Sequence, residues 1–355
     1  MIVPTYDYLI VGQGIAGTLL THFLLKAGQT VMVVDQDAPA AASKVAAGII
    51  NPITGRRYLK SWRIDELLPF AEVTYQALEK QLDLHFFHPR RIIRAMFSPG
   101  EENDWLARTA QPGYENYIAD QLELGAYQQH ISPARAFGEI LQGAQVELGK
   151  LVNHYRAYLE ELNIYRETAF DYTQLIIEKD HVQYRDIRAK RVVFCEGIQV
   201  KQNPYFNYLP FQGAKGEVLI IKVPTVNFDK ILKHKLFIVP LGNDHYWIGS
   251  TYDNHYQETG PTEAGKQRLL SKLQEMLKVP FEIVDHLAAI RPTVRDRRPF
   301  LGVHPKIDKL FLFNGLGTKG ASLGPFWANK MMHFLLENQL LDPEVDIQRF
   351  YNFFD

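Results

Sequence analysis

Cysteine is almost absent from this chain of 355 residues, in which Cys195 is the sole example. A single thiol cannot close an internal disulfide, and it offers no cluster that could hold zinc or an iron–sulfur centre. The histidines show no ligand spacing with neighbouring acids, so we predict no metal site. Low cysteine usage is typical of a reducing compartment, and we therefore expect a cytoplasmic location.

An excess of charge of either sign is also absent, because 39 basic side chains stand against 40 acidic ones. No field from the whole molecule would draw it to nucleic acid or to an anionic membrane, which argues against both as partners. No apolar run approaches the roughly 20 residues that a membrane span needs. The N-terminus has no basic segment followed by an apolar stretch, so we expect no secretory signal. No pattern selects an oligomeric state.

Residues 6–35 have the order of a dinucleotide-binding unit. The apolar patterns predict a strand over 6–11, a helix over 15–26 and a second strand over 31–34. Gly28 is expected to end the helix. Because strand, loop, helix, strand and acid follow one another without a break, we predict that an ADP moiety binds here.

The loop of this unit, Gly12-Gln13-Gly14-Ile15-Ala16-Gly17, carries three glycines. They would provide a tight turn, a close backbone approach to a pyrophosphate and tight packing of helix on strand. Asp35 follows the second strand, where it can accept hydrogen bonds from a ribose diol. Its charge would repel a 2′-phosphate, so NADP is not expected.

A second glycine loop, Gly315-Leu316-Gly317-Thr318-Lys319-Gly320, also follows a strand and opens a helix. No further strand and acid come after that helix, so a second nucleotide unit is not completed. Exposed N–H groups at a helix start stabilise negative charge. A reduced flavin carries such charge at N1 and the C2 carbonyl, whereas NAD has no equivalent requirement. The loop therefore favours FAD over NAD.

The remaining patterns predict an α/β protein: a Rossmann-type FAD-binding domain with an inserted substrate domain built on an antiparallel sheet. We expect the FAD-binding domain to be discontinuous, over 1–84, 149–210 and 291–355. The substrate domain would take 85–148 and 211–290.

Several other elements are predicted from periodicity alone. They are helices over 64–82, 150–162 and 321–337, a strand pair over 84–97, strands over 163–165, 191–195, 217–223, 236–239, 246–250 and 309–313, and a hairpin from 172–177 to 181–188.

Together these motifs resemble the D-amino acid oxidase family of FAD-dependent oxidoreductases, which includes glycine oxidase and sarcosine oxidase. Beyond the two glycine loops and Asp35, the resemblance rests on Ala46-Ala47-Gly48-Ile49-Ile50, Val192-Val193-Phe194-Cys195-Glu196-Gly197, Lys215-Gly216-Glu217, Ile248-Gly249-Ser250-Thr251, Ile290-Arg291-Pro292-Thr293 and Pro299-Phe300-Leu301-Gly302. It covers nearly the whole chain. It implies hydride transfer from the carbon beside an amine to flavin N5, with a small amine or amino acid as substrate.

The resemblance also implies which residues hold FAD, and we expect a noncovalent cofactor because Cys195 lies in a predicted buried strand. The expected FAD-binding residues are Gly12, Gly14, Ile15, Ala16, Gly17, Asp35, Gln36, Ser43, Ala47, Gly48, Gly197, Gly315, Gly317, Thr318, Lys319 and Gly320.

The three expected catalytic residues are Arg291, Tyr252 and Lys319. Arg291 occupies the position that binds substrate carboxylate in glycine oxidase-like members, and a planar guanidinium suits a carboxylate better than an ammonium does. The alternative for Arg291 is a structural salt bridge. Phe237 stands where D-amino acid oxidases commonly place a tyrosine, and Tyr252 or Tyr246 could supply the missing hydroxyl. Lys319 either adds positive charge beside the flavin or is an exposed loop lysine.

The stretch 51–58, Asn-Pro-Ile-Thr-Gly-Arg-Arg-Tyr, is polar and basic and follows Gly48. It would favour a substrate with a second anionic group if it lines the cavity, and the alternative is a surface loop. Three rival functions remain: oxidation of 2-hydroxy acids, the flavin step of a tRNA wobble-uridine modification enzyme, and flavin binding without catalysis. The chain lacks the methyltransferase domain and the basic balance expected of the tRNA enzyme.

Overall fold

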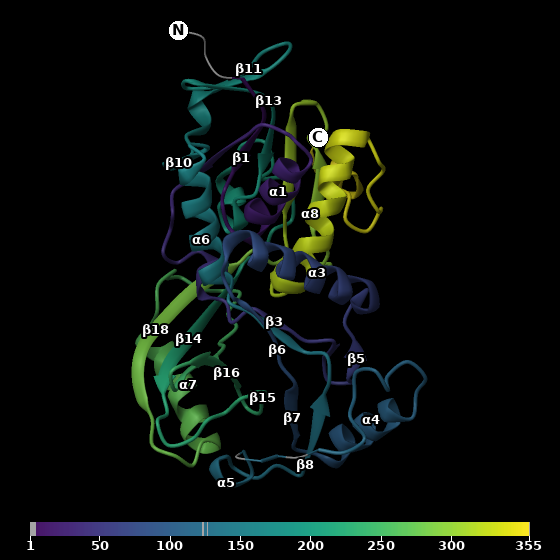
Figure 1. Cartoon of the computed structure of the whole chain (residues 1–355), viewed down its shortest axis with the longest axis vertical. Helices are drawn as coiled ribbons and strands as arrows, with labels where there is room; N and C mark the ends of the chain where they lie inside the picture. Colours follow the sequence, from purple (N-terminus) through teal and green to yellow (C-terminus); the bar gives the residue numbers. More distant parts are fainter. Residues whose placement is uncertain (1–4, 123, 126, 355) are drawn as a thin grey trace.

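The computed structural model describes residues 5–122, 124–125 and 127–354, so residues 1–4 of the first predicted segment lie outside it. Within the described part, two large sheets form the two ends of an elongated molecule, with helix α3 (Ile64–Leu82) crossing between them (Figure 1). The helix has the bounds that its periodicity predicts, and its apolar side is buried.

The first sheet combines strands of the dinucleotide unit with strands from residues 165–194 and from the C-terminal part of the chain, 300–314. Strands β1 (Thr5–Val11) and β2 (Val31–Asp35) pair in parallel, as a strand–helix–strand unit requires, and β13 (Ile187–Phe194) and β20 (Leu310–Asn314) extend the parallel ladder on the other side. Its strands in spatial order are β10 (Tyr165–Glu167), β2 (Val31–Asp35), β1 (Thr5–Val11), β13 (Ile187–Phe194), β12 (Val182–Tyr184) and β11 (Leu175–Ile177), with β20 (Leu310–Asn314) also on β13 and β19 (Phe300–Val303) on β20.

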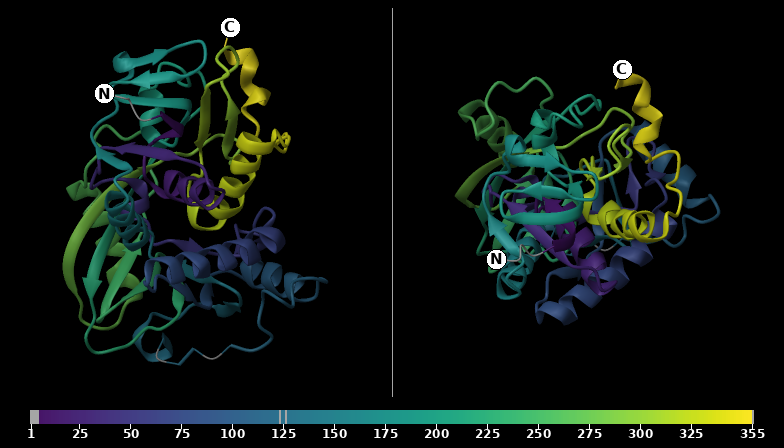
Figure 2. Two further views of the ribbon diagram at one scale, coloured as in Figure 1. Left: turned by 45° about the horizontal axis from the view of Figure 1, so that its top comes forward. Right: turned by 90° about the horizontal axis from the view of Figure 1, so that it is seen from above.

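Helices α1 (Ile15–Lys26) and α8 (Gly320–Glu337) pack against each other beside this sheet, and α3 packs on α8 (Figure 2). The helix α1 ends as predicted, because Gly28 adopts a φ of 77° and its N–H bonds to the carbonyl of Leu25. Helix α6 (Leu148–Glu161) begins two residues earlier and ends one residue earlier than predicted.

The second sheet carries the strands predicted between 211 and 291. It is antiparallel except where β15 (Ile231–Lys233) pairs in parallel with β7 (Ile92–Met96), which comes from a distant part of the chain. Its order is β18 (Glu282–Arg291), β14 (Ala214–Lys222), β17 (His245–Gly249), β16 (Phe237–Gly242), β15 (Ile231–Lys233), β7 (Ile92–Met96) and β8 (Ala136–Ile140). Helix α7 (Glu263–Met276) covers one face of this sheet, and the other face turns toward the first sheet.

One prediction for this region is wrong. The strands expected as a pair over 84–97 are β6 (Phe87–Pro89) and β7, and they belong to different sheets. The small sheet joins β6 to β9 (Ala144–Val146) and β3 (Ile49–Ile50), because those segments flank the junction between the two ends of the molecule. The domain bounds themselves stay a prediction.

The remaining short elements are β4 (Ile53–Thr54), β5 (Leu59–Lys60), α2 (Ala42–Val45), α4 (Pro99–Thr109), α5 (Tyr127–His130) and three turns of 3-10 helix, η1 (Tyr172–Gln174), η2 (Gly197–Gln202) and η3 (Ile347–Phe353). The predicted hairpin is present as β11 and β12, with its first residues in η1. In the described part of the chain, no helix is long and apolar enough to cross a bilayer.

Candidate active site

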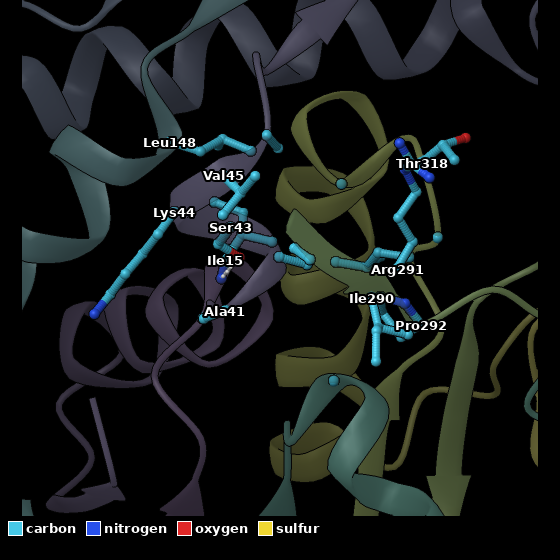
Figure 3. Close-up of a pocket in the computed structure, with 18 of the residues that line it drawn as sticks. Ile15, Ala41, Ser43, Lys44, Val45, Leu148, Ile290, Arg291, Pro292 and Thr318 are labelled. Atoms are coloured by element: carbon cyan, nitrogen blue, oxygen red, sulfur yellow. Dashed lines mark hydrogen bonds between the residues drawn. The ribbon is translucent and has the colours of Figure 1, made fainter. Parts of the chain in front are cut away.

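A cavity of about 630 Å³ lies where the carboxyl ends of β1 and β2 meet the inner face of the second sheet. One wall comes from the first glycine loop, α2 and α6, and the other from β18 and the loop before α8. Figure 3 shows these walls facing each other, with Ile15 and Ser43 on one side and Arg291 and Thr318 on the other. Segments far apart in the sequence therefore build one site.

Most of the residues expected to hold cofactor or substrate line this cavity. Those that do are Gly12, Gly14, Ile15, Ala16, Asp35, Gln36, Ser43, Ala47, Gly48, Gly197, Tyr252, Arg291, Gly317, Thr318, Lys319 and Gly320. Gly17 and Gly315 do not line it.

Gly12 and Gly17 allow the loop to fold tightly against the end of β13. Gly12 has a φ of 97°, and a Cβ there would lie 2.6 Å from the carbonyl oxygen of Cys195. A Cβ on Gly17 would lie 1.8 Å from the carbonyl oxygen of Gly12. Gly17 is thus required for packing of helix on strand, while the residues before it face the cavity.

The side chains around this loop hold its backbone. Ser43 accepts a hydrogen bond from the Ile15 N–H (3.0 Å), and Asp35 accepts from the N–H of Gln13 (2.8 Å) and of Asp37 (2.7 Å). Besides the Ser43 contact, the N-terminus of α1 has no cap from its N-cap residue, Gly14, and its first turn holds no acid. It therefore presents a positive pole to the cavity.

Arg291 ends β18 with its guanidinium buried in the opposite wall. Nη2 donates to Ser250 Oγ (2.6 Å) and to the Thr251 carbonyl (3.5 Å), while Nη1 is buried without a partner. Among the described residues it forms no ion pair, so the salt-bridge alternative is wrong. Burial lowers the pKa of Arg291, and the nearby Tyr252 partly offsets this. A buried, unneutralised cation is costly and needs an anion to complete it.

Gly216 on β14 makes room for that guanidinium, because a Cβ on Gly216 would lie 2.0 Å from Nη2. Sequence reasoning gave no role to Gly216 or Ser250, although both lie in motifs of the family resemblance. Their role depends on the register between β14 and β18, which pairs Ala214 with Arg291 and Gly216 with Ala289. The order of residues in the sequence does not give this register.

Of the two candidate tyrosines, the structure brings only Tyr252 to the cavity. Its ring lies 5.6 Å from Arg291 Cζ, and the side chain is half exposed at the opening. Tyr246 is buried on the α7 side of the sheet, where its hydroxyl contacts the backbone of Val226 and Phe228. The prediction that Tyr246 could serve was wrong because alternate residues of a strand face opposite sides. Phe237 lines the cavity as expected.

Lys319 is a cavity residue and not an exposed loop lysine. Its Nζ donates to Ser61 Oγ at 3.3 Å. Burial lowers the pKa of Lys319, and Arg297 and Arg298 lower it further. Gly315 instead supports the turn before Lys319 with a φ of 77°, where a Cβ would lie 3.3 Å from the Phe300 amide nitrogen.

The polar stretch 51–58 divides between its two alternatives. Asn51 and Thr54 line the cavity, whereas Arg56 and Arg57 are exposed at the tip of the β4–β5 hairpin. The arginines therefore do not supply a second cation to the cavity wall.

Glu196 is a lining residue that sequence reasoning missed as a functional group. It follows β13 beside Gly12 and accepts hydrogen bonds from the Tyr172 hydroxyl (2.5 Å) and from Asn203 Nδ2 (2.8 Å). Burial raises the pKa of Glu196 to about 7, against the opposing effect of those two donors. The neighbouring Cys195 is fully buried, and burial raises the pKa of its thiol. No group of metal-ligating side chains occurs among the described residues.

Comparisons with known proteins identify relatives over nearly the whole length. The family model for DAO, FAD dependent oxidoreductase, matches residues 7–332. A glycine oxidase of Bacillus licheniformis is 24% identical over 94% of each chain. The glycine oxidase structure from Geobacillus kaustophilus has a TM-score of 0.78 at 21% identity over 98% of each chain. The iminodiacetate oxidase structure from Chelativorans sp. BNC1 gives 0.77 at 19% identity, over 97% of this chain and 98% of that one. These matches confirm the predicted fold class.

Proposed function

This chain belongs to the DAO family of FAD-dependent oxidoreductases, and from that premise we propose that it oxidises the C–N bond of a small amine or amino acid carrying a carboxylate. FAD is the cofactor. The named relatives that oxidise glycine or iminodiacetate support this choice of substrate class.

The residues of the cavity fit FAD. The N-terminus of α1 and the backbone of Gly12 and Gly14 would face the pyrophosphate, and Asp35 would face the ribose. The small side chains over residues 38–47 leave room for a flat ligand along the wall. Lys319 and the start of α8 supply positive charge at the other end, where the reduced ring system needs it. No thiol other than the buried Cys195 is available, so we propose a noncovalent cofactor.

FAD, when bound, supplies the hydride acceptor. The protein then has to bind the substrate, orient it and exclude water. Arg291 would hold the carboxylate, with Phe237 and Trp247 as the apolar wall beside it. Among the described lining residues the acids are Asp35 and Glu196, and both lie by the first glycine loop. No carboxylate therefore stands beside Arg291 to act as a base, and the amine would lose its proton to solvent before transfer.

The observation that carries this proposal is the unpaired, buried guanidinium of Arg291. Ser250 and Thr251 hold this guanidinium by hydrogen bonds, and Gly216 leaves the space that it occupies. The cation is therefore preorganised for a planar anion. A small substrate carboxylate supplies the geometry and the charge that the site lacks.

Anaerobic flavin bleaching across a panel tests the proposal. We expect glycine derivatives or D-amino acids to reduce the flavin fastest, and matched amines without a carboxylate to reduce it slowly. Fast reduction by 2-hydroxy acids would replace the amine assignment. Reduction only by a modified RNA would favour the tRNA alternative, and no reduction by any compound would indicate a flavin-binding protein.

A further inference from the structure

Strand β14, which pairs with β18 next to Arg291, has a different role on each of its faces. Gly216 turns toward the cavity and seats the guanidinium, whereas the side chains of Lys215 and Glu217 point to the face that α7 covers. Glu217 has an exposed fraction of only 4%. Neither charged residue touches the cavity, so neither is explained by the proposed reaction.

Glu217 fastens both ends of the segment 251–262. At the first end, its amide N–H donates to Thr251 Oγ1 (2.8 Å) and its carbonyl accepts from the Thr251 N–H (3.1 Å). At the other end, its carboxylate accepts from the Thr262 N–H (2.9 Å) and the Thr262 hydroxyl (2.8 Å). Glu217 thus joins the two ends of this loop, and a backbone pair between Lys215 and Asp253 (2.8 and 3.0 Å) also holds its first end.

That loop forms part of the cavity wall. Tyr252 and Thr259 line the cavity, and Tyr252 lies against Arg291. The Thr251 carbonyl and the preceding Ser250 hydroxyl accept the two hydrogen bonds of Arg291 Nη2. The position of the loop therefore sets the position of the guanidinium.

The residues around Glu217 favour the ionised form of its carboxylate. Burial alone would raise its pKa, but the Thr262 hydrogen bonds and the ion pair with Lys215 (3.0 Å) lower it overall. The His286 Nε2 lies 2.9 Å from its other oxygen. A Cβ on Gly265 would lie 2.1 Å from Glu217 Oε2, so this glycine lets the start of α7 approach the carboxylate.

We propose that Glu217 is a positioning residue for substrate carboxylate recognition. By tying the Thr251 and Thr262 ends of one loop together, it holds the Ser250–Tyr252 segment that orients Arg291. This inference rests on the proposed function, because it requires Arg291 to bind a carboxylate. It predicts that loosening the Thr262 end weakens carboxylate binding without disturbing FAD.

The test uses Thr262, because changing Glu217 itself would leave the buried Lys215 without its ion-pair partner. Thr262→Ala removes the hydroxyl bond to Glu217, and Thr262→Ser keeps it. Thr262 also caps α7 by accepting from the Gly265 N–H (3.1 Å), so Ser98→Ala, which removes the matching cap of α4, is the stability control. The probe is methoxyacetate, a small carboxylate without an amine, whose binding to the holoenzyme is followed by the flavin spectrum.

We expect Thr262→Ala to weaken methoxyacetate binding by about tenfold and to speed amide exchange over 252–261. In turnover, KM for the best carboxylate amine should rise with less change in kcat. Thr262→Ser should stay within about twofold of the parent. Ser98→Ala should lower the melting temperature by a similar amount and leave methoxyacetate binding unchanged.

Equal methoxyacetate binding by Thr262→Ala and the parent would overturn the positioning role. So would an equal loss in Ser98→Ala, since the effect would then follow general stability. An Arg291→Lys variant separates the two proposals. If it binds methoxyacetate as tightly as the parent, the carboxylate assignment to Arg291 fails. If it loses binding while Thr262→Ala does not, only the role of Glu217 fails.

Discussion

The two halves of the cavity are built in opposite ways. The nucleotide half comes mainly from one continuous run, in which Gly12, Asp35 and Gly48 lie within a single stretch of chain. The substrate half combines Gly216 of β14, Ser250 directly after β17, and Arg291 at the end of β18. The first is a local motif whose geometry follows from residue order. The second exists only when the strands pair in one register.

The comparison teaches where each kind of function tolerates change. In the half proposed to hold the nucleotide, backbone atoms would do the binding, so glycine positions are restricted by space. In the half proposed to hold the substrate, a single buried side chain, Arg291, would carry the recognition, and its neighbours orient it. Substitutions should therefore separate FAD retention from substrate recognition.

The largest effect is expected for Gly12→Ala in the nucleotide half. The new Cβ would meet the Cys195 carbonyl at 2.6 Å in a backbone with positive φ, at a cost of about 3 kcal/mol or more. Gly28→Ala is the matched control, because Gly28 also has positive φ but nothing lies within 4 Å of its Cβ. Titration of both apoproteins with FAD should show lost binding for Gly12→Ala only. Retained binding by Gly12→Ala would show that the loop can shift.

A pH-dependent effect is expected in the nucleotide half, at Glu196. Burial raises the pKa of Glu196 from 4.5 to about 7. The folded protein then holds a proton that the unfolded chain releases, so stability falls as pH rises from about 4.5 to about 7. Glu196→Gln cannot ionise and removes this loss, so its stability relative to the parent should improve by about 2 to 3 kcal/mol between pH 5 and pH 8. Urea midpoints at both pH values measure it, and a constant difference would contradict the assignment.

A smaller effect is expected for Asp35. Asp35→Ala should weaken FAD binding by about 1 to 3 kcal/mol, because the ribose acceptor and the acceptor for the Gln13 and Asp37 amides are lost together. Asp35→Asn retains one carbonyl oxygen and should lose less. Calorimetric titration with FAD gives both values. Unchanged affinity in Asp35→Ala would remove Asp35 from the nucleotide site.

Much of the fold could be predicted wherever periodicity is local. Helices α1 and α3 have the predicted bounds because their apolar spacing and flanking residues act within a few turns. The pairing of β6 and β7 could not be predicted, because adjacent strands in the sequence joined different sheets. The same limit applies to the site. The first glycine loop could be predicted from residue order, whereas the space that Gly216 leaves for Arg291 depends on strand register.

The most direct measurement of the central claim is anaerobic flavin reduction by an Arg291→Lys variant, with Arg298→Lys as the control. Arg298 lies over Trp62 outside the cavity lining, and its substitution should leave reduction unchanged. Arg291→Lys should keep the FAD spectrum and the fold, yet lose about 2 to 4 kcal/mol of transition-state stabilisation with carboxylate amines, because an ammonium cannot reproduce the planar two-bond fork. Compact amines without a carboxylate should be hardly affected. Loss of FAD, unfolding, or equal loss with both kinds of amine would contradict a carboxylate-binding role for Arg291.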